Sequence, residues 1–406
     1  MTSVEMEIQR KMQPDTIYLD NNATTRVAPE VFEAMRPYFC ERYGNPSSIH
    51  RFGGSVAAEI EKARCAVADL IGAKYRNKDG NATEIIFTSC GTESDNTALQ
   101  CAVRAAHGKR KIITSAVEHP GINHYLDELA RQNYEIVKIG VDGQGRLKMD
   151  DFRAALDGNT AVVSMMYANN ETGTIFPVAE LCRLAHEAGA YFHTDAVQAA
   201  GKVEIDVDRD GFDFLSISGH KLHAPKGVGV LFARRGIPFT PLILGGHQEK
   251  MRRGGTENVA SIIGLGEACR MAKSALPEEI GYLASLRDAF EAKLKASIPD
   301  IRINGDLEHR LPNTSSVSFE DIEGESILML LDQFGICASS GSACTTGSLE
   351  PSHVMRAMNI PYTAAHGTIR FSLSKYNTPA ELDFTAQKLV PVIARLREIS
   401  PYWKKK

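Results

Sequence analysis

The sequence lacks the features that mark secreted, membrane-spanning and nucleic-acid-binding proteins. No apolar run approaches the roughly 20 residues of a transmembrane helix, and the opening MTSVEMEIQRKMQPD has no apolar signal-peptide core. The eight cysteines include no C-x-x-C pair, which is typical of reduced intracellular thiols in a chain of 406 residues. A formal net charge of −4 argues against nucleic acid as the main partner. We expect a cytoplasmic protein that binds neither membranes nor nucleic acids.

What the sequence does contain is a long alternation of strand-like and helix-like segments. Between about residues 84 and 233, short β-rich runs alternate with helical patterns. Continuous apolar strands separated by helices predict a mostly parallel sheet covered on both faces. After about residue 265, longer helical patterns surround fewer strands, among them SSVSFE (315–320) and TIRFSLS (368–374). The expected fold class is α/β, with a large domain and a smaller α/β C-terminal domain.

Polar and ionisable residues follow five of the predicted strands, at the point where each strand ends. They are Gly91 and Thr92 after EIIFTS, Glu118 and His119 after KIITS, Asn169 and Asn170 after AVVSMMY, Asp195 and Gln198 after AYFHT, and Ser218, His220 and Lys221 after FDFLSI. In open α/β sheets, ligands bind outside the carboxyl ends of the strands. A purely structural sheet does not need such groups at five consecutive strand ends. We therefore predict an active site there.

One kind of ligand uses all of these groups, namely a phosphorylated aromatic aldehyde. The amine of Lys221 can form a Schiff base with the aldehyde, and the carboxylate of Asp195 can hold a ring nitrogen protonated, which makes the ring an electron sink. A helix N-terminus offers donors for a phosphate dianion. The remaining groups divide into phosphate donors (Gly91, Thr92, Ser218 and His220), a stacking ring (His119) and partners for a phenolic oxygen (Gln198 or Asn170). This set describes pyridoxal 5'-phosphate.

Nine motifs carry a resemblance to a known family. They are YLDNNATT (18–25), GNPSSIH (44–50), FTSCGTESDN (87–96), EHP (118–120), ANNETGT (168–174), HTDAVQ (193–198), SGHKLHAPKGVG (218–229), RRGGTEN (252–258) and SSGSACTTGSLEPSHV (339–354). Together they resemble the cysteine desulfurases of the class V aminotransferase family, most closely the nitrogen-fixation (NifS) type. The resemblance runs from about residue 16 to the end of the chain.

The resemblance implies the aminotransferase fold of type I and three parts of the chain. Residues 1–30 would form an N-terminal segment that packs with the small domain. Residues 31–264 would form the large pyridoxal-phosphate-binding domain. Residues 265–406 would form the small C-terminal domain, which carries a mobile loop with Cys344.

The resemblance also implies a role for each site residue. Lys221 is the Schiff-base lysine, Asp195 pairs with the pyridine nitrogen, and His119 stacks on the ring and takes part in catalysis. Arg370, in TIRFSL, would form a fork with the carboxylate of L-cysteine. The others are Gly91, Thr92, Ser218 and His220 at the phosphate, Gln198 and Asn170 at the ring hydroxyl with Asn170 also near the substrate, and Thr256 at the phosphate of the partner subunit in a homodimer.

Cys344 stands in a Ser/Gly-rich run that favours a flexible surface segment. A thiolate there can attack the substrate's sulfur and keep it as a persulfide while the substrate leaves as L-alanine. The ordinary thiol pKa near 8.5 leaves little thiolate at neutral pH, so the thiol needs activation, for which the resemblance offers His119. We expect no stable metal site, although Cys344 can be a transient iron–sulfur ligand shared with a scaffold. The other cysteines, such as Cys337, are expected in the core.

The expected function is therefore a cysteine desulfurase that delivers sulfur to an iron–sulfur scaffold protein, with nitrogenase maturation as the pathway that the resemblance implies. Two other readings stay open. The chain can be another enzyme of the same fold, either a lyase acting on selenocysteine and cysteine or a transaminase, although a transaminase would not need Cys344. It can also be a non-catalytic assembly scaffold, although the set of Lys221, Asp195 and Arg370 argues against that.

Overall fold

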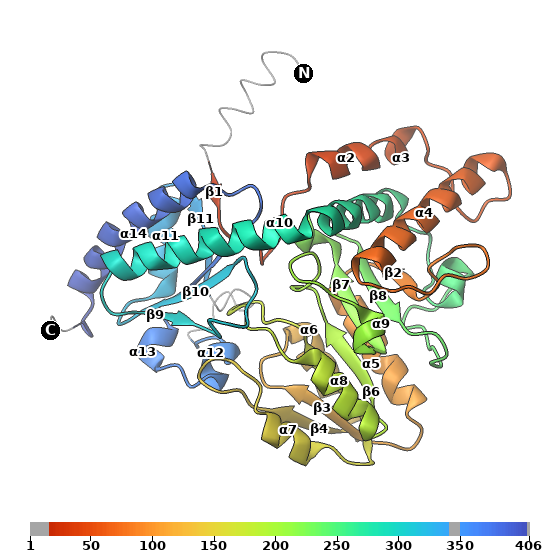
Figure 1. The fold of residues 1–406 in the computed structure, drawn as a ribbon, viewed down its shortest axis with the longest axis horizontal. Helices are drawn as coiled ribbons and strands as arrows, with labels where there is room; N and C mark the ends of the chain where they lie inside the picture. Colours follow the sequence, from red (N-terminus) through yellow and green to blue (C-terminus); the bar gives the residue numbers. More distant parts are fainter. Residues whose placement is uncertain (1–15, 341–349, 404–406) are drawn as a thin grey trace.

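The computed structural model describes residues 16–340 and 350–403, and its two main sheets lie in two lobes (Figure 1). The large lobe is built on a seven-stranded sheet of order β2-β8-β7-β6-β5-β3-β4. All neighbouring strands are parallel except that β8 runs antiparallel to β2 and β7. The strands are β2 (Ile85–Thr88), β3 (Lys111–Ser115), β4 (Glu135–Ile139), β5 (Thr160–Met166), β6 (Tyr191–Asp195), β7 (Phe214–Ser218) and β8 (Gly229–Ala233).

Helices cover both faces of this sheet because neighbouring residues of its strands enter different cores. Ile112 packs in one core with Leu99 and Leu126, whereas Ile113 packs in another with Leu181 and Val67. This alternation is what a strand period of two residues requires. The covering helices are α5 (Gly91–Ala105) and α6 (Pro120–Arg131) on one face, and α4 (Arg51–Leu70) and α8 (Val178–Glu187) on the other. A mostly parallel sheet covered on both faces confirms the predicted fold class.

The small lobe is built on a four-stranded antiparallel sheet of order β12-β13-β10-β9. Phe319 and Phe371 in its strands share a core with Leu294 and Leu389 from the long helices. The elements of this lobe are β9 (Ile301–Asn304), β10 (Thr314–Phe319), α11 (Gly324–Asp332), β11 (Ile336–Cys337), β12 (Ser339–Ser340), α12 (His353–Ala357), α13 (Tyr362–Ala365), β13 (Thr368–Ser372) and α14 (Pro379–Ile399).

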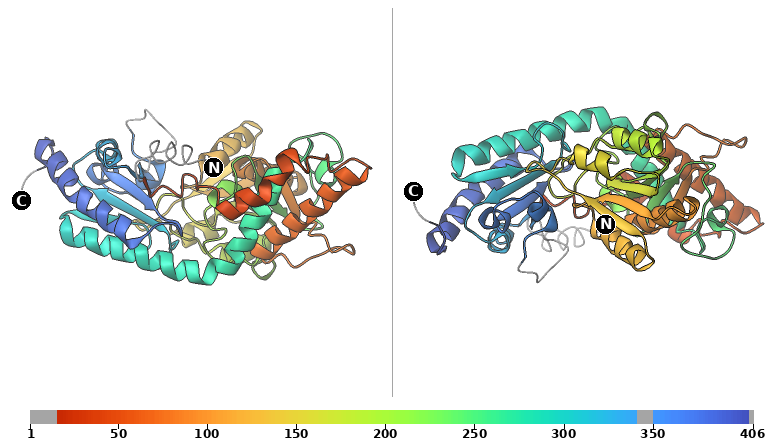
Figure 2. Two further views of the ribbon diagram at one scale, coloured as in Figure 1. Left: turned by 90° about the horizontal axis from the view of Figure 1, so that it is seen from above. Right: turned by 90° about the horizontal axis from the view of Figure 1, so that it is seen from below.

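One helix, α10 (Val259–Ser297), runs along both lobes on one side of the molecule (Figure 2). Its first part packs on α4 and its later part on α14. Gly266 allows the close approach to α4, because a Cβ built on it would lie 2.5 Å from the Cβ of Ala63. Residue 264, where we place the domain boundary, lies inside this helix, and the division into domains stays a prediction.

The N-terminal segment passes from the small lobe to the large one. Strand β1 (Ile17–Tyr18) pairs in parallel with β11, and Leu19 lies in the small core. A few residues later, the hydroxyl of Thr25 donates to the carbonyl oxygen of His220 in the large lobe. In the part of the chain that is described, no helix has the length and apolar character needed to span a bilayer. The remaining elements are α2 (Pro29–Met35), α3 (Pro37–Cys40), α7 (Met149–Ala155), α9 (Val207–Asp210), η1 (Gly219–Lys221) and η2 (Gln248–Met251).

Candidate active site

A cavity of about 540 Å³ lies at the carboxyl ends of the parallel strands, between the two lobes. Ten of the predicted site residues line it: Gly91, Thr92, His119, Asn170, Asp195, Gln198, Ser218, His220, Lys221 and Arg370. Thr256 does not line it and is exposed in the segment before α10. Cys344 lies outside the described residues. The structure therefore brings together every predicted residue that it describes except Thr256.

Lys221 projects from the three-residue turn η1 that follows β7. Its Nζ donates to the backbone oxygens of Asn22 and Ala23, at 2.6 Å from each. Both acceptors belong to the N-terminal segment, which therefore forms part of the wall of the cavity. The sequence motif YLDNNATT contains these residues, but backbone acceptors leave no side-chain pattern from which their contact could be predicted.

Asp195, at the end of β6, is one of several carboxyl groups buried beneath the cavity. Its Oδ1 accepts the N–H of Val197 at 2.9 Å. Burial, and then the charge of Asp95, raises the pKa of Asp195 to about 6, and burial raises the pKa of Asp95 to about 7. Burial likewise raises the pKa of Glu118 to about 8. A protonated ring nitrogen beside Asp195 would supply the positive charge that favours its ionised form, so this carboxyl fits a pyridinium.

One end of the cavity is formed by the start of α5 and the end of β7. A Cβ added to Gly91 would lie 2.8 Å from the Cγ2 of Val197, so glycine lets the helix start approach the neighbouring loop. The Nδ1 of His220 lies 3.1 Å from the hydroxyl oxygen of Thr24. Burial, and then the charge of Lys221, lowers the pKa of His220 to about 4, so the ring is a neutral hydrogen-bonding group. The backbone N–H groups at the start of α5 and the neutral ring of His220 fit a phosphate dianion.

His119 caps the N-terminus of α6. Its Nδ1 accepts the backbone N–H of Gly121 at 3.1 Å, so a neutral His119 carries its proton on Nε2. Burial is the main cause that lowers the pKa of His119 below its ordinary value. A Cβ built on Gly121 would lie 3.0 Å from the Thr92 hydroxyl oxygen, which places the starts of α5 and α6 side by side. A neutral ring over the cavity fits stacking on an aromatic cofactor.

Arg370 comes from β13 of the small lobe and is 4% exposed. One guanidinium nitrogen, Nη2, lies 2.9 Å from the Oδ1 of Asp20, and Nη1 donates to the carbonyl oxygen of Asn170 at 3.1 Å. Its Nε is buried and has no partner among the described residues. The guanidinium is thus held from two sides at the wall of the cavity, in the way that a carboxylate-binding fork requires.

Gln198 is held by a lysine that the sequence did not single out. The Nζ of Lys202 donates to the backbone oxygen and the Oε1 of Gln198, at 3.1 and 3.0 Å, and the Nε2 of Gln198 donates to the carbonyl oxygen of Asn22. These bonds fix which end of the Gln198 amide faces each partner. Burial, then the charges of Lys221 and Arg370, lowers the pKa of Lys202 to about 7.

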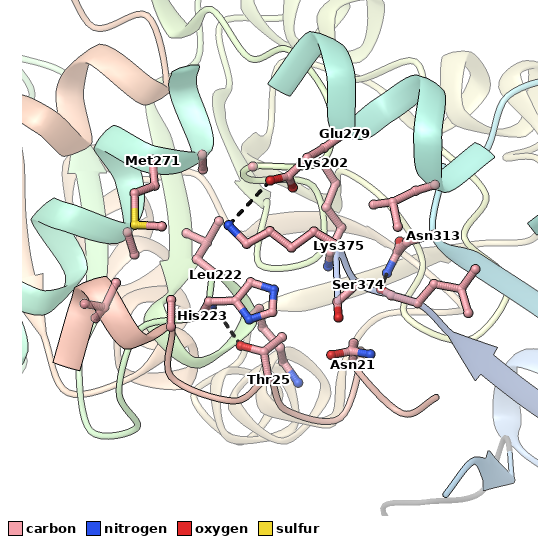
Figure 3. Close-up of a pocket in the computed structure, with 18 residues that line it drawn as sticks. Asn21, Thr25, Lys202, Leu222, His223, Met271, Glu279, Asn313, Ser374 and Lys375 are labelled. Atoms are coloured by element: carbon pink, nitrogen blue, oxygen red, sulfur yellow. Dashed lines mark hydrogen bonds and ion pairs between the residues drawn. The ribbon is translucent and has the colours of Figure 1, made fainter. Parts of the chain in front are cut away.

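Lys202 also lines a second, smaller cavity of about 40 Å³ (Figure 3). Lys221 borders both cavities. Groups from different elements are paired in its wall, as Figure 3 shows. Lys375 lies 3.5 Å from Glu279, and the backbone N–H of His223 donates to the hydroxyl oxygen of Thr25. The small size of this cavity and its paired walls make it a packing gap between the N-terminal segment, η1 and α10.

Further residues of the main cavity were not predicted as site residues. Burial raises the pKa of Glu171 to about 7, and its Oε2 accepts the hydroxyl of Ser352 from the small lobe at 2.6 Å. Ser352, His353 and Arg356 form the wall next to α12. These residues belong to or follow the motif SSGSACTTGSLEPSHV, but a wall formed by a helix start has no strand-end pattern from which it could be predicted.

The prediction that the cysteines other than Cys344 lie in the core is wrong for part of the set. Within the described ranges, only Cys101, Cys182 and Cys269 are buried. Cys40 is exposed because it ends the short surface helix α3, and Cys90 lines the cavity because it precedes the start of α5 at a strand end. A small apolar side chain does not by itself specify burial.

Comparisons with known proteins agree with this geometry. The family model of aminotransferase class V matches residues 17–384. Cysteine desulfurase NifS of Azotobacter vinelandii is 54% identical over 387 residues, which cover 95% of each chain. A cysteine desulfurase of Gluconacetobacter diazotrophicus is 53% identical over 390 residues, which cover 96% of each chain.

Solved structures show the same likeness. A NifS-like protein is 37% identical with a TM-score of 0.86, and the alignment covers 94% of this chain and 100% of that one. SspA in complex with cysteine is 31% identical with a TM-score of 0.77, and the alignment covers 89% of this chain and 100% of that one. Class V aminotransferases are pyridoxal-phosphate enzymes, and the lysine, the buried carboxyl and the donor-rich helix start described above fit that cofactor. The chain belongs to the class V aminotransferase family.

Proposed function

We propose that this protein is a cysteine desulfurase, which removes the sulfur atom of L-cysteine and leaves L-alanine. The observation that carries the proposal is a single cavity that unites the amine of Lys221, the carboxyl of Asp195 and the guanidinium of Arg370. An amine, a ring-nitrogen partner and a carboxylate fork are what a pyridoxal-phosphate enzyme needs to act on an amino acid. Curated relatives above 50% identity that are named cysteine desulfurases support this choice of reaction.

Each residue then has a defined task. Pyridoxal phosphate, when bound, supplies an electron sink for bonds next to the substrate's α-carbon. Lys221 would hold it through Nζ and move protons at the substrate, and Asp195 would keep the ring nitrogen protonated. The phosphate would be bound by Gly91, Thr92, Ser218 and His220, and the ring would be contacted by His119, Gln198 and Asn170.

Arg370 would bind the carboxylate of L-cysteine, with Asn170 beside it. The Nη1 and Nη2 bonds to the Asn170 carbonyl and Asp20 keep the guanidinium plane fixed before the substrate arrives. A fixed plane is favourable because a bidentate bond to a carboxylate depends on geometry as well as on charge. A free amino acid, rather than an amine or a peptide, is therefore the proposed substrate class.

Cys344 is the proposed acceptor of the sulfur. Its thiolate would attack the sulfur atom of the substrate, so that an S–S bond forms while the C–S bond breaks. The electron pair of the broken bond stays on the carbon skeleton, which takes up a proton and leaves as L-alanine. The thiol of Cys344 becomes a persulfide. A transaminase would have no use for this thiol, and a selenium-specific lyase would differ in the surroundings of the thiol.

A peptide mass spectrum after brief exposure of the pure holoenzyme to L-cysteine, without reductant, tests the proposal. We expect the peptide that contains Cys344 to gain one sulfur atom while L-alanine appears. A Cys344→Ser variant should keep the absorbance of the cofactor and should no longer form L-alanine. Alanine formation with unmodified Cys344 would indicate a lyase, and the absence of both products would contradict the proposed function.

A homodimer is part of the proposal, because Thr256 would reach the phosphate of the partner's site. Supporting it, large apolar side chains are exposed near that segment, with Leu244 at 80% and Met251 at 64%. The buried Glu249 accepts two hydrogen bonds from Arg64 and holds this segment in place. Sedimentation analysis should give a dimer that Leu244→Asp with Met251→Asp converts to monomers with weaker cofactor binding.

The acceptor of the persulfide sulfur would be an iron–sulfur scaffold protein, with nitrogenase maturation as the pathway that the NifS name of the Azotobacter relative suggests. A cytoplasmic location belongs to the same proposal. The cysteines within the described ranges are all free thiols, which suits a reducing compartment. Transfer of radioactive sulfur from the loaded enzyme to a purified scaffold protein, in the absence of free sulfide, would test the acceptor.

A further inference from the structure

Three histidine rings line the main cavity, those of His119, His220 and His353, and the hydrogen bonds of His119 and His353 fix opposite tautomers. His119 uses Nδ1 to accept the backbone N–H of Gly121, so its neutral ring has the proton on Nε2. His353 has its Nε2 3.0 Å from the backbone oxygen of Glu118. A carbonyl oxygen can only accept, so the Nε2 of His353 must carry a proton and a neutral His353 has its lone pair on Nδ1.

The consequence is that the two rings cannot do the same work. A neutral His119 offers a donor at Nε2, and the nitrogen that could take up a proton is already occupied by Gly121. A neutral His353 offers an acceptor at Nδ1, and this nitrogen has no hydrogen-bond partner among residues 16–340 and 350–403. Of these two rings, His353 is therefore the one that is prepared to accept a proton.

His353 is also held firmly in position. The preceding residue, Ser352, accepts the N–H of Val354 at 3.1 Å and donates to Glu171 at 2.6 Å, which fixes the start of α12. The acceptor at the other end is equally fixed, since the Oε1 of Glu118 receives the N–H of Met166 and the hydroxyl of Ser115. A base held by its neighbours on both sides needs no rearrangement when a proton arrives.

The surroundings keep this ring uncharged. Burial is the largest cause that lowers the pKa of His353 below its ordinary value, and the positive charges of Arg356 on α12 and Lys138 on β4 lower it further. The hydrogen bond to Glu118 acts in the opposite direction. Further titratable or charged groups among the described residues near it are His119, whose own pKa is lowered partly by His353, the Glu118 carboxyl, and the Glu350 carboxylate, which lies 3.6 Å from Arg356.

We propose that His353 is a catalytic general base, whose Nδ1 accepts the ammonium proton of the incoming amino acid. This rests on the proposed function, because L-cysteine arrives with a protonated amine and its nitrogen needs a free lone pair to bond to carbon. An N–H bond of the ammonium breaks, its electron pair stays on the amine nitrogen, and an Nδ1–H bond forms on His353. The resulting imidazolium releases the proton to solvent.

The variant His353→Gln tests this directly, because the side-chain amide of glutamine can still donate to the Glu118 carbonyl but cannot act as a base near neutral pH. We expect kcat/KM for L-cysteine to fall about 100-fold or more, as for the loss of a general base, with the cofactor absorbance unchanged. We also expect the acid limb of the wild-type pH profile to disappear. Added imidazole should restore part of the activity of His353→Ala. His124→Gln, at a side chain 83% exposed, is the matched control and should behave like wild type.

A chemical measurement on the wild-type holoenzyme gives a readout besides activity. Diethyl pyrocarbonate reacts with unprotonated imidazole nitrogen, so peptide mapping near pH 7 should find His353 modified, and saturating L-alanine should protect it while His124 still reacts. Wild-type kcat/KM in His353→Gln, or an unreactive His353, would overturn the proposal. If His353→Gln fails to fold, the peptide mapping of the wild-type holoenzyme still tests whether His353 is an unprotonated, accessible base. If wild type forms no alanine at all, it is the proposed function that fails.

Discussion

The two lobes contribute to one cavity in different ways. The large lobe places Asp195 at the end of β6 and Lys221 in the turn that follows β7, where topology alone brings strand ends to one edge. The small lobe contributes Arg370 from inside an antiparallel strand and His353 from the start of a five-residue helix. No rule of strand order predicts that these two residues meet the large lobe. The difference teaches that the strand-end rule identifies the cofactor side of such a site and misses much of the substrate side.

The charges of the two walls differ as well. The large lobe buries carboxyl groups at its side of the site, and burial raises the pKa values of three of them, Asp195, Asp95 and Glu118. The small lobe brings the cationic Arg370 and the basic Arg356. A cationic ring nitrogen suits the first wall and an anionic substrate carboxylate suits the second. The division of labour that we propose between the lobes therefore has an electrostatic basis.

The largest effect should come from the cofactor side. Lys221→Ala removes the amine that would hold pyridoxal phosphate, so we expect no measurable turnover of any amino acid and loss of the visible absorbance of the lysine-bound cofactor. Alanine formation and the absorption spectrum measure the two effects. Lys226→Ala, at an exposed lysine in the same turn region, should leave both unchanged. Residual turnover at more than a trace would break the assignment of the cofactor to the large lobe.

The next effect compares the cores of the two lobes. Phe232→Ala in the large core and Phe371→Ala in the small core each empty a fully buried site and should lower the free energy of unfolding by about 3–5 kcal/mol. The single tryptophan, Trp403, follows the last helix of the small lobe and stacks on Arg397, so its fluorescence reports that lobe. Cofactor release reports the large one.

We expect urea titrations of Phe371→Ala to shift the tryptophan transition, and those of Phe232→Ala to shift chiefly the cofactor transition, because the two cores share no residues. Equal shifts of both probes in both variants would mean that α10 couples the lobes into one cooperative unit. The division near residue 264 that the sequence suggested would then have no thermodynamic meaning. Val390→Ala, at an exposed side chain of α14, is the control for the substitution itself.

How much of the site could be predicted from the sequence depends on whether its contacts are local in the chain or join distant segments. The seven strands of the large sheet and the residues after them were predictable because apolar runs and strand ends are local features. Arg370 and Thr256 came only from the family resemblance. Lys202 could not be predicted, since its partner is the neighbouring Gln198 and its burial depends on the N-terminal segment folding over it.

A smaller effect tests the substrate side. Arg370→Lys keeps the positive charge but loses the planar fork, so we expect KM for L-cysteine to rise about 10- to 150-fold, the equivalent of a charged hydrogen bond worth about 1.5–3 kcal/mol. The cofactor spectrum should not change, because the large lobe binds it. Cysteamine, which lacks the carboxylate, should bind both proteins equally weakly. An unchanged KM would place the carboxylate elsewhere and undo the proposed division of labour.

The smallest effect concerns Lys202, which lies between the lobes. Its pKa is lowered to about 7 in the folded chain by burial first, against the ordinary 10.5. Between those two values the unfolded chain binds more protons, so stability from this group rises with pH, by at most about 1.4 kcal/mol per unit. Below pH 7 the buried charge destabilises the fold fully.

Lys202→Met removes this titration, so urea midpoints measured between pH 7 and 9 should rise less steeply in the variant than in wild type. Removing the buried charge should stabilise the variant at pH 7, and the lost hydrogen bonds to Gln198 will offset part of this gain in stability. Lys226→Met, at an exposed lysine, is the control. If Lys202 orients Gln198 toward the ring, the cofactor spectrum should shift with pH in wild type and not in the variant. If the urea midpoint rises equally steeply with pH in wild type and in the variant, the amine of Lys202 reaches solvent and the two lobes do not close over it.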